Sequence, residues 1–399
     1  MKKELPKILI ISEFFFGEKT GGGILLKNLF EDYPKDKIFI VHEETNLKND
    51  HEVKSFALKS NNRFSFFIKR ILPGSFIQVL IRIKNFNLFN KRKKINPLLI
   101  KEIEKFKPRM IYTILGNYNL MCLIKDIKIK LNIPIMTHIM DNMPAMFSKK
   151  KPDESKLFNF FVNNSKTRVA INSKMADVFK KKYKYNFEII HNGVDKKKIQ
   201  KVKTNKNFKV LTYIGSVFKN AQLNSLVKIA KAVKSLNKKN NNLNCYFFFP
   251  ESQKLMYYSH FPKSRNIFVK SHNLNDNEYF DVISKSDLLI LASNFDHHSV
   301  EYYKYSWPAK MGTYLMSKVP IFIFGPKKIY FINSAIKKLW AFVDSSDSVN
   351  SLEISIEKIL NNLDLRKKVL DNAIIMSKEF EIRKIKRKFI NLIIETVRE

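Results

Sequence analysis

Three polar side chains in the C-terminal half of the chain have the spacing of one helical face. Lys310, Thr313 and Tyr314 follow one another at i, i+3 and i+4, so a helix over 308–317 presents an ammonium, a hydroxyl and a phenol together. Pro308 suits the first turn of that helix, because the N–H that proline lacks has no partner there. The pattern favours binding of a nucleotide diphosphate. The alternative is that Lys310 is an ordinary solvated lysine.

Two apolar runs, 287–293 and 319–325, flank this helix and are typical of parallel strands buried on both faces. A helix that follows the carboxyl end of a parallel strand points its free N–H groups at the crevice where open α/β sheets bind ligands. We therefore expect the phosphates at the beginning of the 308–317 helix.

His138 and Asp141 are the best candidates for acid/base chemistry. They lie at the carboxyl end of a predicted strand over 134–140, where an open sheet presents ligand-binding groups. Asp141, and secondarily His138, would take a proton from an acceptor hydroxyl. The alternative is that Asp141 caps the following turn and that His138 is a hydrogen-bonded core histidine.

A run of three glycines, Gly21, Gly22 and Gly23, follows the first predicted strand, 7–11, and precedes a helical pattern. The whole chain has only ten glycines, so this run predicts close approach of the backbone to a ligand. A flexible turn without a ligand is the alternative.

Strand and helix patterns alternate along nearly the whole chain, and such repeated units imply parallel sheets. We predict an α/β protein with two Rossmann-like domains, 1–200 and 201–380, that face a central cleft. A lysine-rich linker separates them, and the pattern restarts with a strand from Lys209 to Gly215. Helices are predicted at the end of the chain over 349–360, 363–380 and 382–397. The other predicted strands are 37–43, 110–115, 168–172, 187–191, 244–250 and 267–270. Further helices are predicted over 95–106, from Gly116 to about Leu131, from Asn172 through Tyr183, over 221–236 and over 275–286.

The composition is that of a folded protein: 399 residues, 45% hydrophobic and 27% charged. Two cysteines, Cys122 and Cys245, lie far apart in apolar runs, which gives neither a disulfide framework nor metal-ligand spacing and fits a reducing cytoplasm. The N-terminal residues read as a first strand, because glutamates interrupt them and no small-residue cleavage site follows. No apolar stretch is long enough to predict a spanning helix.

The net charge of +37 would draw the chain to anionic surfaces, although lysine is abundant everywhere in it. Segment 59–101 has no acidic residue and alternates Lys and Arg with apolar side chains. This pattern favours contact with an anionic membrane through Arg70, Arg82 and Lys84. An ordinary core-facing helix with solvated lysines is the alternative. The chain has no recognisable nucleic-acid-binding module, so we expect no nucleic acid partner.

Several motifs resemble those of GT-B glycosyltransferases, specifically family 4 and its bacterial envelope polysaccharide branch. The resemblance covers nearly the full length. The segment 191–195, HNGVD, resembles the NGVD turn of the family, and THIMDNMPAMF, 137–147, is similar to the HxMDDWP segment of that branch. SWPAKMGTYLMSKVPIFIFGP, 306–326, is similar to SLPTKxxDYLASGxPxxxxGP and is the most specific match. DNAIIMSKEF, 371–380, resembles the closing helix, after which the last helix, 381–399, is implied to return to the first domain.

The resemblance implies transfer of a sugar from a nucleotide-sugar, such as a UDP- or GDP-sugar, without metal or further cofactor. The acceptor would be lipid-linked or a polysaccharide, met by a cytoplasmic enzyme at the inner membrane face. The family has two glutamates eight positions apart, here Tyr305 and Thr313, and a glycine where this chain has Lys318. The missing carboxylates leave an inactive GT-B-like partner protein as the alternative. The implied donor contacts are Gly21, Gly22, Gly23, Asn192, Gly215, Lys219, Lys310, Thr313 and Tyr314.

Overall fold

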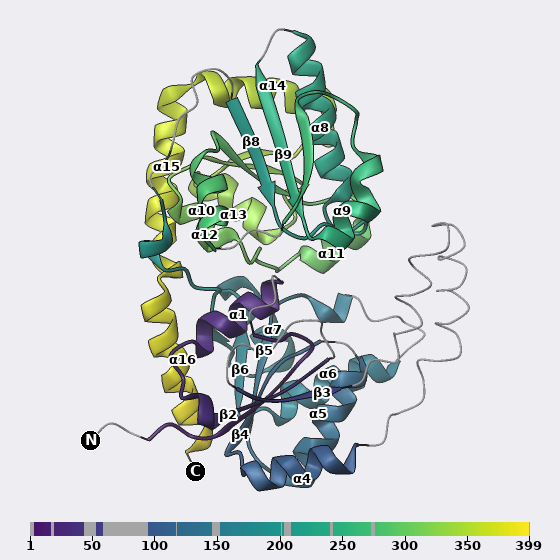
Figure 1. Ribbon diagram of the computed structural model, residues 1–399, viewed down its shortest axis with the longest axis vertical. Helices are drawn as coiled ribbons and strands as arrows, with labels where there is room; N and C mark the ends of the chain where they lie inside the picture. The colour runs from purple at the N-terminus through teal and green to yellow at the C-terminus, as the bar shows by residue number, and fades with distance from the viewer. Residues whose placement is uncertain are drawn as a thin grey trace.

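The computed structural model describes residues 4–16, 20–43, 53–58, 95–116, 118–145, 152–200, 202, 209–239, 242–272 and 276–398. The predicted membrane residues Arg70, Arg82 and Lys84 lie outside these ranges. Within them the chain forms two α/β domains, one above the other in Figure 1.

The N-terminal domain contains a parallel sheet of seven strands in the order β3-β2-β1-β4-β5-β6-β7. The central strands are buried on both faces, because helices cover each side and every residue of runs such as ILIIS is apolar or small. The strands are β1 (Ile8–Ser12), β2 (Ile38–Glu43), β3 (Lys54–Leu58), β4 (Met110–Ile114), β5 (Ile135–Ile139), β6 (Thr167–Ala170) and β7 (Glu188–Ile189).

The helices of this domain are α1 (Gly21–Phe30), α4 (Pro97–Phe106), α5 (Tyr118–Leu131), α6 (Pro152–Asn164) and α7 (Ser173–Tyr183). Side-chain caps set several helix starts: Asn96 accepts from the Leu98 N–H, and Asn172 accepts from the Met175 N–H.

The C-terminal domain contains a second parallel sheet, in the order β10-β9-β8-β11-β12-β13. Its strands are β8 (Lys209–Ile214), β9 (Leu243–Phe249), β10 (Ile267–Ser271), β11 (Leu288–Ala292), β12 (Ile321–Phe324) and β13 (Phe342–Asp344). Its helices are α8 (Leu223–Lys238), α9 (Glu251–Tyr257), α10 (Asp276–Ser284), α11 (His297–Tyr303), α12 (Met311–Met316), α13 (Tyr330–Lys338), α14 (Val349–Asn361) and α15 (Leu363–Ser377).

The helix predicted over 308–317 is shorter in the structure. It is α12, Met311–Met316, and Lys310 occupies its N-cap. Pro308 lies before the helix, and its carbonyl accepts a hydrogen bond from the Met311 N–H in a preceding turn. After α12, Lys318 adopts φ +60°, a left-handed conformation that ends the helix at a place where glycine is usually found.

The last helix, α16 (Ile382–Val397), leaves the C-terminal domain and packs on the N-terminal one, as Figure 1 shows in yellow. Phe389 packs edge-to-face on Phe30 of α1, with ring centroids 5.1 Å apart. At the crossover, the Val194 N–H donates to the Phe380 carbonyl at 2.8 Å, and the Ile382 N–H donates to the Val194 carbonyl at 3.2 Å. The two domains are therefore joined by two chain crossings that hydrogen-bond to each other.

No helix in the described part of the chain is both long and apolar enough to cross a membrane.

Candidate active site

A cavity of about 1510 Å³ lies between the two domains. Its lining includes the residues that follow β1, β4 and β5 of the first sheet and β8 and β11 of the second. Ligands of open parallel sheets bind at the carboxyl ends of strands, so this cavity is the candidate active site.

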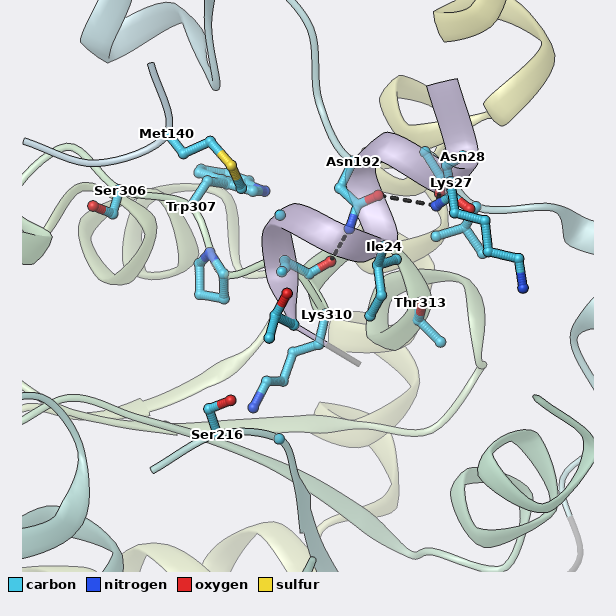
Figure 2. A pocket seen from close by; sticks show the side chains of 18 of the residues that line it. Ile24, Lys27, Asn28, Met140, Asn192, Ser216, Ser306, Trp307, Lys310 and Thr313 are labelled. Carbon is cyan, nitrogen blue, oxygen red and sulfur yellow. Dashed lines mark hydrogen bonds between the residues drawn. The ribbon is translucent and has the colours of Figure 1, made fainter. Parts of the chain in front are cut away.

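Lys310 enters the cavity from the C-terminal domain, and Figure 2 shows it reaching toward Ser216. Its ammonium lies 3.8 Å from the centre of the Tyr213 ring. No described carboxylate forms an ion pair with it, and burial lowers the pKa of Lys310 to about 7. A cation held over an aromatic face without a counter-ion is suited to an anionic ligand.

Gly215, directly after β8, makes room for that ammonium. A Cβ at this position would lie 2.4 Å from Lys310 Nζ, and the backbone has φ +142°. The positive φ favours glycine here, and the absence of a Cβ leaves room for the Lys310 ammonium.

Asp141 lines the cavity from the N-terminal domain, at the carboxyl end of β5. It accepts hydrogen bonds from the Ser306 hydroxyl at 2.7 Å and from the Tyr302 hydroxyl at 3.2 Å, both in the other domain. Burial raises the pKa of Asp141 above its usual value, and these two hydrogen bonds act in the opposite direction. A carboxylate with a raised pKa, at the cavity wall, is suited to accept a proton.

His138 is in the core of the N-terminal domain, so the prediction of a catalytic histidine is corrected. It is fully buried within β5, Nδ1 lies 2.8 Å from the Tyr112 hydroxyl, and it does not line the cavity. Burial lowers the pKa of His138 to about 3. Side chains alternate across a strand, and position 138 faces the protein interior.

The three glycines form the first turn of α1 rather than a loop before it. Gly21 and Gly22 line the cavity, whereas the Gly23 N–H donates to the Thr20 hydroxyl at 3.1 Å. Because its N–H is used in this cap, Gly23 does not fit the prediction that it contacts a ligand. A Cβ on Gly22 would lie 2.1 Å from the Phe14 ring, so packing within the domain accounts for that glycine.

Asn192 joins the two domains at the cavity wall. Its amide oxygen accepts from Asn28 at 3.0 Å, and its amide nitrogen donates to the Ala309 carbonyl at 3.2 Å, as the dashed lines in Figure 2 show. Ala309 immediately precedes Lys310, so Asn192 fixes the loop that presents the ammonium. The neighbouring Gly193 is held against α16, because a Cβ would lie 2.6 Å from Ile382.

The sequence matches no protein-family profile and no curated protein. Solved structures do match. Anabaena HepE in complex with UDP and glucose aligns with 98% of this chain and 100% of its own at 10% identity and a TM-score of 0.69. A glycosyltransferase from Rickettsia africae aligns with 98% of this chain and 99% of its own, at 14% identity and a TM-score of 0.64. The α,α-trehalose 6-phosphate synthase from Burkholderia multivorans aligns with 98% of this chain and 97% of its own, at 10% identity and a TM-score of 0.61.

This chain has the GT-B fold. The likeness covers both domains together, so the interdomain cavity corresponds to the cleft of that architecture. At these identities the likeness shows the fold alone.

Not every predicted donor contact reaches the GT-B cleft. Thr313 lines the cavity from α12, whereas Tyr314 is fully buried, and its hydroxyl accepts from the Ile214 N–H at 3.2 Å. Lys219 is exposed and lies outside the cavity lining, although Phe218 and Gln222 on either side of it line the cavity. The prediction that Tyr314 and Lys219 contact the donor is therefore corrected. Tyr314 lies in the core and Lys219 lies on the surface.

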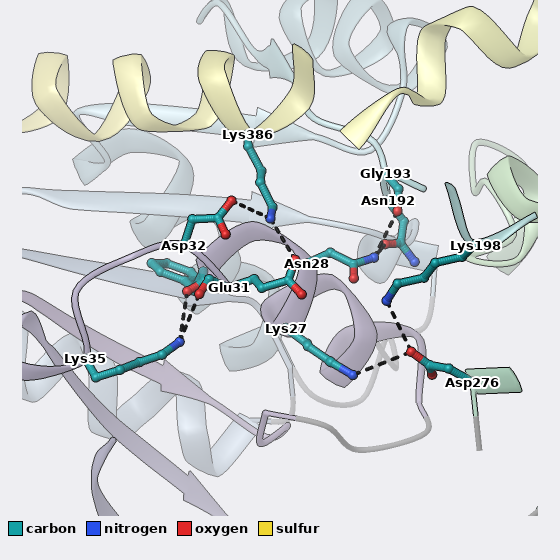
Figure 3. Close-up of polar contacts among 11 residues, drawn as sticks. Lys27, Asn28, Glu31, Asp32, Lys35, Asn192, Gly193, Lys198, Asp276 and Lys386 are labelled. Atoms are coloured by element: carbon teal, nitrogen blue, oxygen red, sulfur yellow. Dashed lines mark hydrogen bonds and ion pairs between the residues drawn. The ribbon is translucent and has the colours of Figure 1, made fainter. Parts of the chain in front are cut away.

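The GT-B cleft has a rim of ion pairs, shown in Figure 3. Lys27 and Lys198 approach Asp276 of the C-terminal domain at 3.9 and 3.2 Å. Lys386 of α16 contacts Glu31 and Asp32, each at 2.7 Å. The Asp276 pairs are largely exposed and contribute little stability, but they cross from one domain to the other.

Sequence reasoning missed the partners of the predicted residues. Tyr302 and Ser306 hold Asp141, and Tyr213 lies beneath Lys310. No local sequence pattern identifies these three residues, because their partners lie far from them in the sequence and meet them only in the folded chain. Glu13, which lines the cavity after β1, had the same signal as Asp141: a carboxylate at the end of a buried strand. No group of three or more His, Cys, Asp or Glu suited to a metal ion occurs among the described residues.

Proposed function

We propose that this protein is a glycosyltransferase that moves a sugar from a nucleoside diphosphate sugar to an acceptor hydroxyl in the interdomain cleft. The observation that carries this proposal is that Lys310 and Asp141 line one cavity from opposite domains. One is a cation without a counter-ion among the described residues, and the other is a carboxylate with a raised pKa.

These two groups match the two charges that develop in the reaction. The departing nucleoside diphosphate gains negative charge, which Lys310 and the free N–H groups at the start of α1 stabilise. The acceptor hydroxyl loses a proton, which Asp141 takes. In this proposal Lys310 supplies the leaving-group charge that a metal supplies elsewhere, so we expect neither metal nor further cofactor.

The donor proposal is a UDP- or GDP-sugar, and the solved relatives favour UDP. Anabaena HepE was crystallised with UDP-glucose as well as with UDP. Gly21, Gly22, Asn192, Gly215, Lys310 and Thr313 are the donor-binding residues of the proposal.

The acceptor proposal rests on the sequence resemblance to the family 4 envelope branch. We propose a lipid-linked or polysaccharide acceptor in bacterial envelope glycan synthesis. The enzyme would be cytoplasmic and peripheral at the inner membrane face, attached through the acid-free segment 59–101.

A nucleotide-sugar panel tests the proposal. Purified protein is incubated with UDP- and GDP-sugars and with lipid-linked and soluble glycan acceptors, and the released nucleotide and the product are measured. Transfer from at least one donor supports the proposal, as does a rise in melting temperature with the matching nucleotide. Absence of both binding and transfer across the panel rejects it.

A non-catalytic GT-B partner protein is the second candidate. Tyr305 and Thr313 stand where family 4 has its paired glutamates, and the Tyr305 carbonyl is used structurally, accepting from Asn172 at 2.7 Å. Nucleotide binding without turnover, unchanged by Asp141→Asn, favours this candidate. Turnover that Asp141→Asn abolishes eliminates it.

A further inference from the structure

Three asparagines of the N-terminal domain form a row at the boundary with the C-terminal domain. Each follows one of three neighbouring strands of the sheet: Asn142 follows β5, Asn172 follows β6 and Asn192 follows β7. All three side chains are buried. The carboxyl ends of neighbouring parallel strands lie about 4.8 Å apart at one edge of a sheet, which brings the three asparagines together.

Each asparagine donates its amide N–H to a backbone carbonyl of the C-terminal domain. These carbonyls are four residues apart in the chain, and they lie in the last turn of α11 and in the connection from α11 to α12, where helical N–H partners are missing. The bonds run from Asn142 to Glu301 at 2.9 Å, from Asn172 to Tyr305 at 2.7 Å and from Asn192 to Ala309 at 3.2 Å.

Each of these carbonyls directly precedes a residue of the candidate active site. The residues that follow them are Tyr302, Ser306 and Lys310. Tyr302 and Ser306 donate to Asp141, and Lys310 brings its ammonium into the cavity; Figure 2 shows the bond from Asn192 that ends just before Lys310. Because a peptide group is planar, a bond to its C=O also fixes the nitrogen of the next residue. The first domain thus orients three active-site residues of the second.

Two of the asparagines are held in turn by a second hydrogen bond. The Asn172 amide oxygen accepts from the Met175 N–H at 2.9 Å and caps α7, and the Asn192 amide oxygen accepts from Asn28 at 3.0 Å. In an amide only the nitrogen donates, so these contacts fix which way each amide points. Both therefore act as rigid links between the first domain and the 301–309 segment.

We propose that Asn172 and Asn192 are positioning residues, each for a different part of the reaction. Asn172 acts on proton transfer, because it holds Ser306 in place to donate to Asp141. Asn192 acts on donor binding, because it holds Lys310 in place for the diphosphate. This inference rests on the proposed glycosyl transfer.

Serine replacements remove the interdomain bonds with little other change. Serine is a good N-cap, so Asn172→Ser keeps the cap of α7, whereas its shorter side chain does not extend to the Tyr305 carbonyl. Asn192→Ser shortens the second link in the same way. Asn96→Ser is the matched control, because Asn96 caps α4 by accepting from the Leu98 N–H and does not line the cavity.

The pH profile of kcat/KM reports on Asn172. Asn172→Ser is expected to move the acidic limb about 0.5–1 pH unit upward, because a loosened Ser306 hydrogen bond favours the ionised form of Asp141 less. The Kd for UDP is expected to stay within about twofold of wild type. Asn142→Ser is expected to move the limb in the same direction through Tyr302, so the test does not depend on the folding of one variant.

The Kd for UDP reports on Asn192. Asn192→Ser is expected to raise it about tenfold, the loss typical of a weakened contact between a charged group and an anion. The acidic limb of kcat/KM is expected to stay in place. Asn96→Ser should match wild type in both measurements. Melting temperatures without ligand establish that each variant is folded.

The inference requires the two measurements to separate. If the acidic limb and the Kd for UDP change together in both variants, the asparagines only hold the domains to each other. If neither changes, they position neither group. Either outcome overturns the inference, while transfer by wild type leaves the proposed function intact. Failure of wild type to use any nucleotide-sugar rejects the proposed function and this inference with it.

Discussion

Asp141 of the N-terminal domain accepts a 2.7 Å hydrogen bond from the Ser306 hydroxyl of the C-terminal domain. The proposed base is therefore oriented by the C-terminal domain, to which the proposal assigns Lys310 and donor binding. Its full set of partners exists only when the two domains are together. In this proposal the position of the base is linked to the domain arrangement through the hydrogen bonds that Asp141 accepts from Ser306 and Tyr302.

Replacement of Asp141 by asparagine keeps the shape and removes the base. We expect the transfer rate to fall about 100- to 10,000-fold, the usual range for loss of a general base. Nucleotide affinity is expected to be unchanged, as measured by calorimetry with UDP. Loss of nucleotide affinity to the same degree would assign Asp141 to donor binding instead.

Removal of the Ser306 hydroxyl is expected to change the pH profile. The rate falls at low pH as Asp141 becomes protonated, and the Ser306 hydrogen bond favours the ionised form. Ser306→Ala therefore raises the pKa of Asp141 further and moves the acidic limb of kcat/KM to higher pH. Tyr303→Phe is the control, because its hydroxyl accepts from Gln222 rather than donating to Asp141. An acidic limb that stays in place in Ser306→Ala would show that Asp141 does not set it.

The affinity for a nucleoside diphosphate is expected to depend on Lys310 protonation. With a pKa of about 7 in the free protein, Lys310 is charged at pH 6 and mostly neutral at pH 8.5. The Kd for UDP should rise over this interval, by about tenfold at most per pH unit, because the ligand binds the protonated form. Lys310→Met should bind weakly at both values. Lys318→Met, an exposed lysine just beyond α12, should behave as wild type; equal pH dependence in Lys310→Met would contradict the assignment.

Gly215→Ala is expected to disturb both the backbone and Lys310. Its φ of +142° is strained for alanine, at a cost of about 1–3 kcal/mol in the free energy of unfolding. The new Cβ also displaces the ammonium, so UDP affinity should fall. In the double variant with Lys310→Ala, the clash between the new Cβ and the ammonium is relieved, whereas the backbone strain at position 215 remains. Denaturant unfolding of the single and double variants can separate these two contributions. Full additivity of the two single changes would show that the Cβ and the ammonium do not meet.

Binding to anionic membranes is expected to depend on the acid-free segment. Each Lys or Arg near an anionic surface contributes about 1 kcal/mol, so Arg70, Arg82 and Lys84 together give reversible, salt-sensitive attachment. We expect co-sedimentation with phosphatidylglycerol vesicles and not with neutral ones, reduced when all three are replaced by glutamine. Equal binding by the triple variant, or no binding by wild type at low salt, would remove this segment from the proposal.

Local patterns determined much of the fold. Buried runs such as 8–12 and 288–292 are strands because nothing in them suits a water-exposed surface, and their alternation with helices led directly to two parallel sheets. The short strands β3 and β13 and the helices α6, α9, α11 and α13 were missed. A half-exposed five-residue strand such as KSFAL has little signal of its own and is defined by its pairing with β2.

The rule that polar residues at the carboxyl end of a parallel strand bind ligands identified Asp141 but failed for His138, because the burial of a side chain depends on the whole sheet. The sequence placed His138 and Asp141 at one strand end, but the tertiary structure decided that one faces the core and the other the cavity. It likewise buried Tyr314 and left Lys219 in solvent. Lys310 was found from its helix spacing, yet its pKa is lowered by burial in the folded chain. The residues that surround its ammonium, Tyr213 and Gly215, stand about a hundred residues earlier. Residue types and spacing determine which groups are available, whereas their solvation and their partners across the cleft are properties of the folded chain.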